Sequence, residues 1–458
     1  MVTHLLEISY TLVVAGFLYY FLLKSQVLHT KRKLILHWAL FGFVVNFYSF
    51  SWLYTLYPIT WMQGGLLQIL GIIIVHLIVA VASGICFTVV VFSHNSHIKK
   101  EFLPFVFAVT LVLAEIFRSL LLSVIFYGND STIALHYTGG TLGNALSTTP
   151  LIEFAYFGGT FALTFILGYL VYCLLSKKNF LEYRLHLAGI FISLLAIHFL
   201  VPITMPHNGT SVGIITTNFE DPDETNYSVR FKEQSKAIHT LTLSLLQASS
   251  TFIVYPEDSR YISYLPQKEG SELSEVSGKT VFIDGDTILT KDGYKTISFF
   301  YYPRGDKKVG RGKDFLLPFN EYMPTLFRGI ILPFVGREKM VSYEKYHTFT
   351  PTHSDKSILV DGSRVGTLIC SEILSYSMIN GLHKERPDIV FFQAHLNAFH
   401  NNPWFVMHLR SFTKIAAAQL RTSVITSTSG APSYIISPHG SIIKTLPVGL
   451  HATMYRFR

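Results

Sequence analysis

The sequence is poor in charge and in cysteine. Only 14% of its 458 residues are charged, against roughly 25% in an average soluble protein. Its three cysteines, Cys86, Cys173 and Cys370, are far apart, and two of them lie inside apolar runs. Neither a disulfide framework nor a cysteine-rich zinc motif is therefore indicated. The sequence also has no Gly-rich phosphate loop, so no nucleotide cofactor is expected.

The charge that is present is unevenly distributed. The net charge is +8, but many of the basic residues lie in short loops between apolar runs, where they indicate membrane orientation and not a nucleic-acid partner. Residues 1–205 hold almost all of the long apolar runs, and residues 206–458 have an ordinary globular composition. We therefore expect two domains, a transmembrane helical bundle over 1–205 and a globular domain over 206–458.

Six apolar segments of the first domain are long enough to cross about 30 Å of hydrocarbon. The first of them lacks a basic leading region and a small-residue cleavage site, so we expect a retained helix and not a signal peptide. The segments are 7–23, 34–57, 66–92, 102–127, 150–175 and 185–205.

The loops between these segments alternate in charge, which predicts their orientation. The loops at 58–65 and 128–149 contain no Lys or Arg. Because basic loops stay in the cytoplasm, we expect the N-terminus and everything after about residue 206 to be extracytoplasmic. The basic loop residues are Lys24, Lys31, Arg32, Lys33, Lys99, Lys100, Lys177, Lys178 and Arg184.

Two ionisable residues interrupt the fourth segment. Glu115 and Arg118 are three positions apart, so they share one helix face. Charges inside a membrane are costly and usually face a partner or a cavity. Two roles follow: an internal ion pair that holds the bundle, or direct recognition of a lipid headgroup or substrate.

The second domain alternates short apolar runs rich in β-forming residues with helical stretches at 226–248 and 403–421. Several of the runs are apolar on both faces, which is typical of a sheet covered by a layer on each side. We therefore expect an α/β layered sandwich. The predicted strands are 211–216, 251–256, 279–285, 296–302, 364–370, 388–393, 423–429 and 432–437.

Three polar residues stand out in this domain. Glu257 and Cys370 close or follow strands, and Lys313 lies in the stretch GRGKDFLLPFNEYMP. A carboxylate can take the proton of a cysteine thiol, and a lysine can stabilise both the thiolate and the oxyanion formed at an attacked carbonyl. The Ser371 backbone N–H, next to the cysteine, is a candidate second oxyanion donor.

Each residue alone also has a structural explanation. A single cysteine at a strand end is commonly part of the core, and a glutamate after a proline is commonly a turn residue. Lys313 follows a stretch containing Lys307, Lys308 and Arg311, which also suits a solvated basic loop.

The surrounding motifs resemble those of the nitrilase superfamily, and from about 38 to 445 the chain resembles the apolipoprotein N-acyltransferases, a membrane-anchored branch of it. IVYPEDS contains Glu257, KDFLLPFNE contains Lys313 and Glu321, and ICSE contains Cys370 and Glu372. The resemblance implies a nitrilase-like αββα sandwich. It also implies catalysis by Glu257, Lys313 and Cys370, with Glu321, Glu372 and Ser371 in support.

In the membrane half the resemblance rests on 41–54, 113–119 and 146–165, and near the end of the chain on 427–440. The sequence also departs from the family pattern. Ser371 replaces a tyrosine, Ala418 replaces a glutamate, and an early tryptophan and a C-terminal membrane helix are missing. HLNAFHNNPW at 395–404 replaces an Asn-Asp-x-Trp-Phe stretch, so its residues are candidates for an altered substrate loop: His395, Asn397, Phe399 and Trp404.

The resemblance implies transfer of an acyl chain from a phospholipid, through a thioester on Cys370, to the α-amino group of a diacylglyceryl-cysteine lipoprotein. The expected location is the bacterial inner membrane, with the lipid bilayer as a partner and the catalytic domain outside. Ping-pong kinetics follow from the shared site.

No cofactor and no metal is expected. Although His395, His400 and His408 are close in sequence, we expect the first two to line a loop beside the pocket and the third to lie on the next helix. Three other functions stay open: a membrane-anchored amidase or hydrolase with the same three residues, an acyltransferase with another amine acceptor, and a non-catalytic binding protein.

Overall fold

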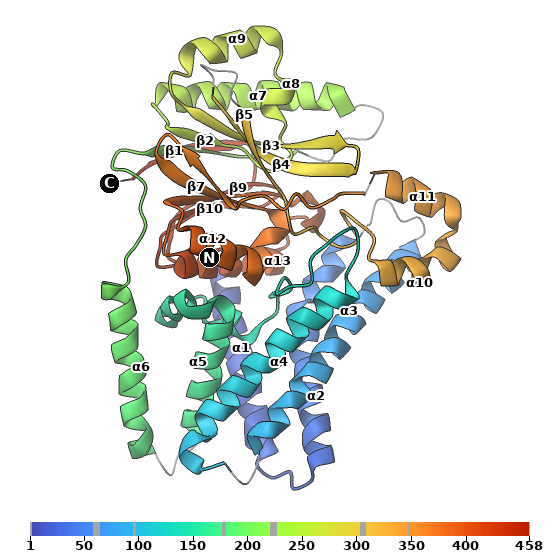
Figure 1. The fold of residues 1–458 in the computed structure, drawn as a ribbon, viewed down its shortest axis with the longest axis vertical. Helices are drawn as coiled ribbons and strands as arrows, with labels where there is room; N and C mark the ends of the chain where they lie inside the picture. The colour runs from blue at the N-terminus through green and yellow to red at the C-terminus, as the bar shows by residue number, and fades with distance from the viewer. Residues whose placement is uncertain are drawn as a thin grey trace.

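The computed structural model describes residues 2–57, 65–94, 98–175, 180–219, 227–302, 308–346 and 348–457. In Figure 1 the helices of the first 200 residues lie below an α/β domain. Most of the 58–65 loop, as well as Lys177 and Lys178, lies outside the described residues. The helices are α1 (Val2–Ser25), α2 (Lys31–Ser49), α3 (Gly65–Phe87), α4 (Leu103–Ile125), α5 (Ala155–Leu175) and α6 (Phe180–Leu200).

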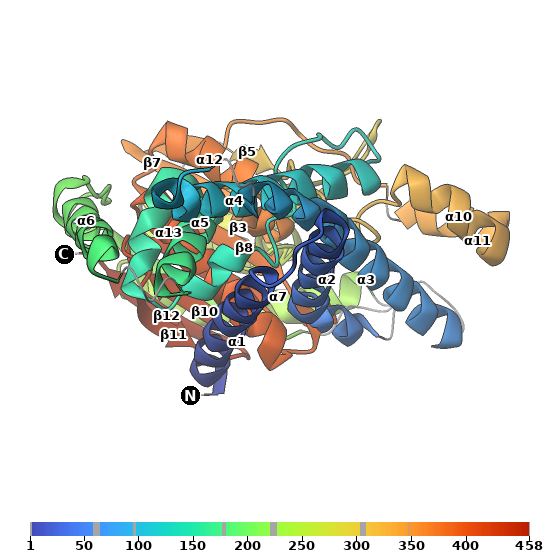
Figure 2. The same cartoon turned by 90° about the horizontal axis from the view of Figure 1, so that it is seen from below.

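Five helical segments of the described chain are long and apolar enough to cross a membrane: Thr3–Ser25, Lys31–Leu56, Gln68–His94, Lys100–Ile125 and Pro150–Leu175. The sixth predicted crossing, 185–205, falls on α6 (Phe180–Leu200), which contains the apolar stretch Arg184–Leu200. The helix ends at Leu200, before Pro202, so the predicted segment is five residues too long at its end. α6 stands apart from the other helices in Figures 1 and 2.

The outer surface of the bundle is apolar, as a lipid-facing surface must be. Large side chains such as Leu12, Leu36, Leu66, Phe157 and Leu185 are more than 60% exposed. The same side chains on a water-soluble domain would form an unusually large apolar surface.

Two six-stranded sheets form the α/β domain. The first has the order β12-β1-β2-β3-β4-β5. Its strands are β1 (Ser211–Thr216), β2 (Phe252–Val254), β3 (Val281–Thr290), β4 (Gly293–Tyr301), β5 (Lys308–Gly312) and β12 (His451–Arg456). The second has the order β11-β10-β9-β8-β7-β6. Its strands are β6 (Ser357–Val360), β7 (Ser363–Ile369), β8 (Ile389–His395), β9 (Val424–Ser429), β10 (Ser433–Ile436) and β11 (Ile442–Leu446).

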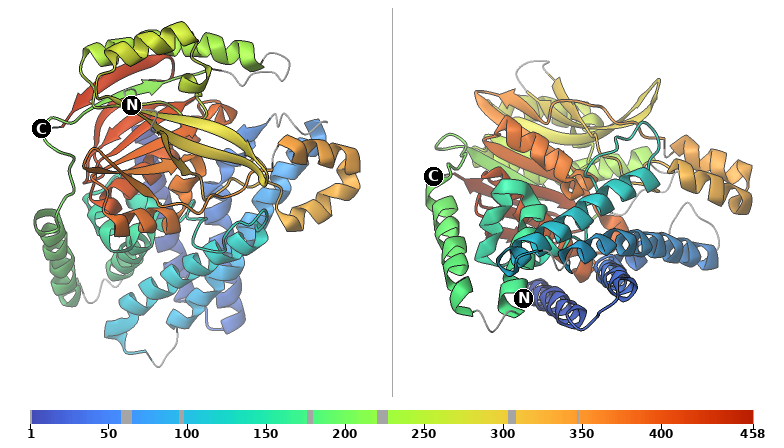
Figure 3. Two further views of the ribbon diagram at one scale, coloured as in Figure 1. Left: turned by 45° about the horizontal axis from the view of Figure 1, so that its top comes forward. Right: turned by 60° about the horizontal axis from the view of Figure 1, so that its bottom comes forward.

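The sheets pack face to face and are covered by helices on their outer faces (Figures 1 and 3). One buried cluster joins Val254 and Ile283 of the first sheet to Phe391 and Ile425 of the second. The outer face of the first sheet packs against α7 (Tyr227–Gln247) and α9 (Gln267–Val276). The outer face of the second packs against α12 (Tyr376–Glu385) and α13 (Pro403–Leu420). This is the predicted αββα sandwich.

α13 also forms the junction with the membrane helices. Its Arg410 donates through Nε to Glu7 of α1 at 2.7 Å, and Trp404 packs edge-on against Tyr10 with ring centroids 5.9 Å apart. Gly159 has φ +56°, and a Cβ there would lie 2.4 Å from Oε1 of Gln419 in α13. Glycine therefore allows the kink that brings α5 against α13.

Glu115 and Arg118 hold the 128–149 loop to the bundle. The Leu142 backbone N–H and the Thr164 hydroxyl donate to Glu115, each at 2.5 Å. Arg118 donates to Asn46 Oδ1 at 2.5 Å and to the Gly139 carbonyl at 2.9 Å. These contacts favour the structural role over direct substrate recognition.

A helical arm projects from the α/β domain beside α3 (Figures 1 and 2). It consists of α10 (Thr325–Val335) and α11 (Arg337–Tyr346). Short helices complete the chain: η1 (Ser51–Leu56), η2 (Thr88–His94), η3 (Lys100–Phe102), η4 (Leu142–Leu146), η5 (Pro150–Phe154), α8 (Tyr261–Tyr264), η8 (Cys370–Leu374) and η9 (Asn397–Phe399).

Candidate active site

Glu257 follows β2, where the chain leaves the first sheet. Its Oε1 accepts from Lys313 Nζ at 3.1 Å, and its Oε2 accepts from the His395 backbone N–H at 3.1 Å. The carboxylate is nearly buried, with the residue 8% exposed. A Cβ on Gly285 of β3 would lie 2.9 Å from Glu257 Cα, so glycine lets the two backbones approach.

Lys313 follows β5 and reaches into the same place. Its ammonium donates to Glu257 and, at 2.8 Å, to Glu321 Oε1. Burial alone would lower the pKa of Lys313, but Glu257 and Glu321, together with Cys370 when it is a thiolate, raise it well above its usual value. A cation is therefore fixed in a site largely shielded from water, where its electrostatic effect is stronger than in solution.

Glu321 orients this lysine. Its second oxygen accepts from the Leu317 backbone N–H at 2.6 Å, which fixes the carboxylate on its own loop. Burial is the main cause of the raised pKa of Glu321, and Lys313 opposes it. The structure thus brings Glu257, Lys313 and Glu321 into one chain of contacts, centred on the lysine.

Cys370 directly follows β7 at the start of η8, and it is half-buried. Its φ is +47°, a left-handed conformation that costs a non-glycine residue energy and is enriched at functional sites. Burial raises the pKa of the thiol well above its usual value, and the Glu257 charge raises it further, while Lys313 lowers it. The resting cysteine is therefore a thiol, and a base must remove its proton before it can attack.

Glu372 holds the turn that carries the cysteine. It accepts from the backbone N–H groups of Ile369 and Asp314, both at 2.8 Å, and is ion-paired with Arg311. Neither side chain of the Arg311–Glu372 pair has exposed area. The pair therefore joins the cysteine turn to the strand and loop that carry Lys313.

Ser371 is fixed through its side chain, because its hydroxyl donates to the Phe315 carbonyl at 2.6 Å. The hydroxyl of Ser371 is therefore already engaged in a hydrogen bond within the fold.

The candidate substrate loop splits into two parts. His395 and Asn397 lie near Glu257: the His395 N–H contacts that carboxylate, and Asn397 Nδ2 is 3.1 Å from His395 Nε2. Phe399 instead stacks on Phe405 with ring centroids 3.7 Å apart, and Trp404 packs edge-on against Tyr48 at 5.0 Å.

The three histidines of this region do not converge. His400 is exposed, and His408 is buried in α13 with its ring 5.1 Å from that of Tyr10. Only His395 is at the site of Glu257.

Cys370 packs against the apolar cluster that lies between the second sheet and the helices α12 and α13. Trp52 and Leu56 of η1, which follows α2, and Tyr137 of the 128–149 loop pack against the same cluster. The cluster therefore joins the membrane half to the part of the α/β domain that carries Cys370.

The membrane half of the chain is similar to a known protein family. Residues 4–173 match the apolipoprotein N-acyltransferase N-terminal domain. For residues 4–173 of this chain, the match confirms the family resemblance predicted from the sequence. A search of curated protein sequences gave no match.

Solved structures of the nitrilase superfamily resemble part of the chain. An amidase variant from Nesterenkonia AN1 is 10% identical, covers 55% of this chain and 92% of its own, and has a TM-score of 0.37. Nit3 from Saccharomyces cerevisiae is 13% identical and covers 54% of this chain and 89% of its own, with a TM-score of 0.39.

A glutamine-dependent NAD+ synthetase from Acinetobacter baumannii is 16% identical, covers 55% of this chain and has a TM-score of 0.40. The match spans 46% of that synthetase, less than half of its length. The sandwich fold itself rests on the two sheets and the helices that cover them.

Sequence reasoning missed Arg311 as a site residue, because a run of basic residues resembles a solvated loop. The structure places Arg311 in strand β5, two residues before Lys313, with its side chain buried. Sequence reasoning also missed Glu153, Arg421 and His439, which come together from distant segments.

Proposed function

We propose that the protein is an apolipoprotein N-acyltransferase that moves an acyl chain from a phospholipid to the α-amino group of a diacylglyceryl-cysteine lipoprotein. The observation that carries the proposal is the convergence of Glu257, Lys313 and Cys370 at strand ends, in a chain whose residues 4–173 match the family's N-terminal domain. More generally, the family match supports an enzyme of the transferase or hydrolase type.

In the first half-reaction, Glu257 takes the proton of the Cys370 thiol as the sulfur attacks the ester carbonyl of the phospholipid. The new C–S bond forms, and the negative charge on the carbonyl oxygen is stabilised by Lys313 and by the Ser371 N–H. The ester C–O bond then breaks. The lysophospholipid alkoxide leaves with the proton from Glu257, and an acyl-thioester remains on Cys370.

In the second half-reaction, the neutral α-amino group of the lipoprotein attacks the thioester carbonyl. Glu257 takes one proton from the amine, the new C–N bond forms and the C–S bond breaks. The proton returns to the Cys370 sulfur, which restores the thiol. One site serves both steps, so ping-pong kinetics are expected.

The proposed location suits both substrates. Each is a lipid held in a bilayer, and Cys370 packs against the same apolar cluster as Trp52 and Leu56, which follow the membrane helix α2. The alternating basic loops support a bacterial inner-membrane protein with its catalytic domain on the extracytoplasmic side. A lipid substrate could then reach the site without passing through water.

A membrane-anchored hydrolase is the second candidate, with water in place of the amine. Two observations favour it: the family tyrosine is replaced by Ser371, and the 395–404 loop differs from the family stretch. The same observations leave room for another amine acceptor.

The deciding experiment is mass spectrometry of a diacylated lipopeptide incubated with phospholipid and the detergent-purified protein, with Cys370→Ala as the control. A third acyl chain on the α-amino group, absent from the control, is expected. Free fatty acid with an unchanged peptide would replace the proposal by the hydrolase. An acyl mass on Cys370 with neither product would direct the search to other amines.

A further inference from the structure

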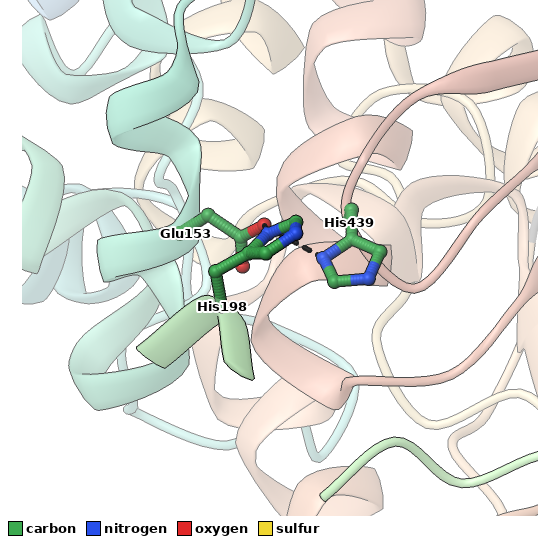
Figure 4. Close-up of side chains that lie close together, drawn as sticks. All are labelled: Glu153, His198 and His439. Atoms are coloured by element: carbon green, nitrogen blue, oxygen red, sulfur yellow. Dashed lines mark hydrogen bonds and ion pairs between the residues drawn. The ribbon is translucent and has the colours of Figure 1, made fainter. Parts of the chain in front are cut away.

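Three side chains meet at the junction of the membrane helices and the α/β domain, away from the site of Cys370. Glu153 lies in η5, His198 in the last turn of α6, and His439 in the turn between β10 and β11. Figure 4 shows both imidazole rings beside the carboxylate. Glu153 Oε1 is 3.0 Å from His198 Nδ1 and 2.7 Å from His439 Nδ1.

This set has the chemistry of a zinc site. Two imidazole nitrogens and one carboxylate oxygen are a common zinc ligand set, and one ligand atom from each residue lies within 4.8 Å of the others. Ligand atoms of a tetrahedral zinc ion are roughly 3.4 Å apart, since each bond is about 2.1 Å long. The two nitrogen–oxygen distances would have to open by less than about 1 Å.

Arg421 fixes the carboxylate in the required orientation. Its NH1 group is ion-paired with the other oxygen of Glu153, Oε2, and its NH2 group donates to the Ile197 and Val201 carbonyls at 3.3 and 3.4 Å. Oε1 is therefore the oxygen that faces the histidines. Carboxylates that bind metals are commonly held in this way by a hydrogen bond from a further residue. Arg421 NH1 also lies 3.4 Å from His439 Nδ1, and its positive charge weakens the binding of a cation, so we expect exchangeable and not permanent zinc.

The site is also accessible. The side chain of His198 is 44% exposed and that of His439 is 27% exposed, while that of Glu153 is 6% exposed. A metal can enter from the His198 side, and water can occupy the fourth ligand position.

The position of the cluster gives it a function. Between α6 and the helices α4 and α5 lies a cavity of about 550 Å³, lined by residues including Phe105, Phe165 and Ile190. α6 therefore packs loosely on α4 and α5 over Leu185–Ser193, and its end is joined to the α/β domain through Glu153 and Arg421. We propose that Glu153, His198 and His439 bind one zinc-type divalent cation, which ties α6 to the α/β domain.

The test uses the full chain in detergent, equilibrated with Zn²⁺ and freed of excess metal, with bound zinc measured by elemental mass spectrometry. We expect about one zinc per chain, and loss of it in His198→Ala and in His439→Ala. The matched control is His207→Ala, which removes an exposed histidine just after α6. Zinc should also raise the Tm of the wild type and of the control, but not of the two site variants.

A second variant keeps the proposal testable if an alanine variant fails to fold. His198→Cys supplies a thiolate ligand, and Co²⁺ bound there should give a sulfur-to-cobalt charge-transfer band that the wild type lacks. Absence of zinc from the wild type would overturn the proposal, as would zinc retained in both alanine variants. Absence of the cobalt band from a folded His198→Cys protein would overturn the assignment of His198. None of these measurements depends on acyl transfer.

Discussion

Arg410 in α13 donates two hydrogen bonds to the carboxylate of Glu7 in α1, and its Nε is 2.7 Å from Oε1. The pair joins the first membrane helix to a helix of the α/β domain. The side chain of Glu7 is 1% exposed and that of Arg410 is 13% exposed, so the pair is shielded from water.

Glu7→Gln should therefore destabilise the protein. It leaves Arg410 without its anionic partner, and removal of one member of a buried pair costs about 3–5 kcal/mol. A clear fall in Tm in detergent is expected, with Glu101→Gln, an exposed residue, as the control. Equal Tm values for both variants would show that the junction does not depend on this pair.

Lys313→Met should slow the acylation of Cys370 by about 10²–10³-fold, the cost of losing one donor to a developing oxyanion. The rate is measured in a single turnover, as the appearance of acyl-protein by mass spectrometry. Lys291→Met removes an exposed lysine in the β3–β4 turn and should leave the rate unchanged. Full acylation by the Lys313 variant would remove the lysine from the proposed mechanism.

Ser371→Ala should have a much smaller effect. The hydroxyl is bonded to the Phe315 carbonyl at 2.6 Å, so its loss removes one hydrogen bond of about 1 kcal/mol and keeps the backbone N–H. We expect the acylation rate to fall less than tenfold. A loss as large as that of Lys313→Met would mean that the hydroxyl acts in the reaction.

The raised pKa of Cys370 predicts slow alkylation at neutral pH. Burial and the Glu257 charge favour the thiol, so the fraction of thiolate should keep rising with pH beyond about 8.5, the usual thiol pKa. The measurement is the iodoacetamide rate against pH in a Cys86→Ala, Cys173→Ala background, which leaves one cysteine.

Glu257→Gln should shift that profile to lower pH, because it removes a charge that raises the pKa of the thiol. The same variant should lose acyl transfer, since it lacks the base. A plateau below about pH 8.5 in the parent protein would indicate a preformed thiolate and a different role for Glu257.

Glu372→Gln should cost both stability and rate. It leaves the buried Arg311 without its partner, at about 3–5 kcal/mol, and loosens the turn that carries Cys370. Glu344→Gln is the comparison, because Glu344 pairs with Arg328, whose side chain is 57% exposed, and exposed pairs contribute about 0–1 kcal/mol. Equal Tm losses in the two variants would contradict the structural role of Glu372.

Much of the α/β domain could be predicted because its central strands are apolar on both faces. The 211–216 prediction coincides with β1, and 423–429 differs from β9 by one residue. The edge strands were missed for the opposite reason. β11 and β12 have exposed or half-exposed residues at most positions, so they lack a continuous apolar signal.

The candidate site was predictable only in part. The strand ends that carry Glu257 and Cys370 are visible in the sequence, as is the spacing between Lys313 and Glu321. The Arg311–Glu372 pair and the Glu153–His439 contact depend on segments that meet only in the folded chain. The end of the sixth apolar segment was predicted too late, because apolar residues of 185–205 continue beyond Leu200, where α6 ends.

The pairing of β1 with β12 has a consequence for biosynthesis. Ser211 at the start of the domain lies opposite Arg456 in the antiparallel register, so nearly the whole domain is synthesised between the two partners. Until β12 arrives, β1 has an open edge, and open strand edges can pair with other chains. The nascent domain therefore passes through a stage in which β1 has no strand on one side, while the membrane helices before it have already been made.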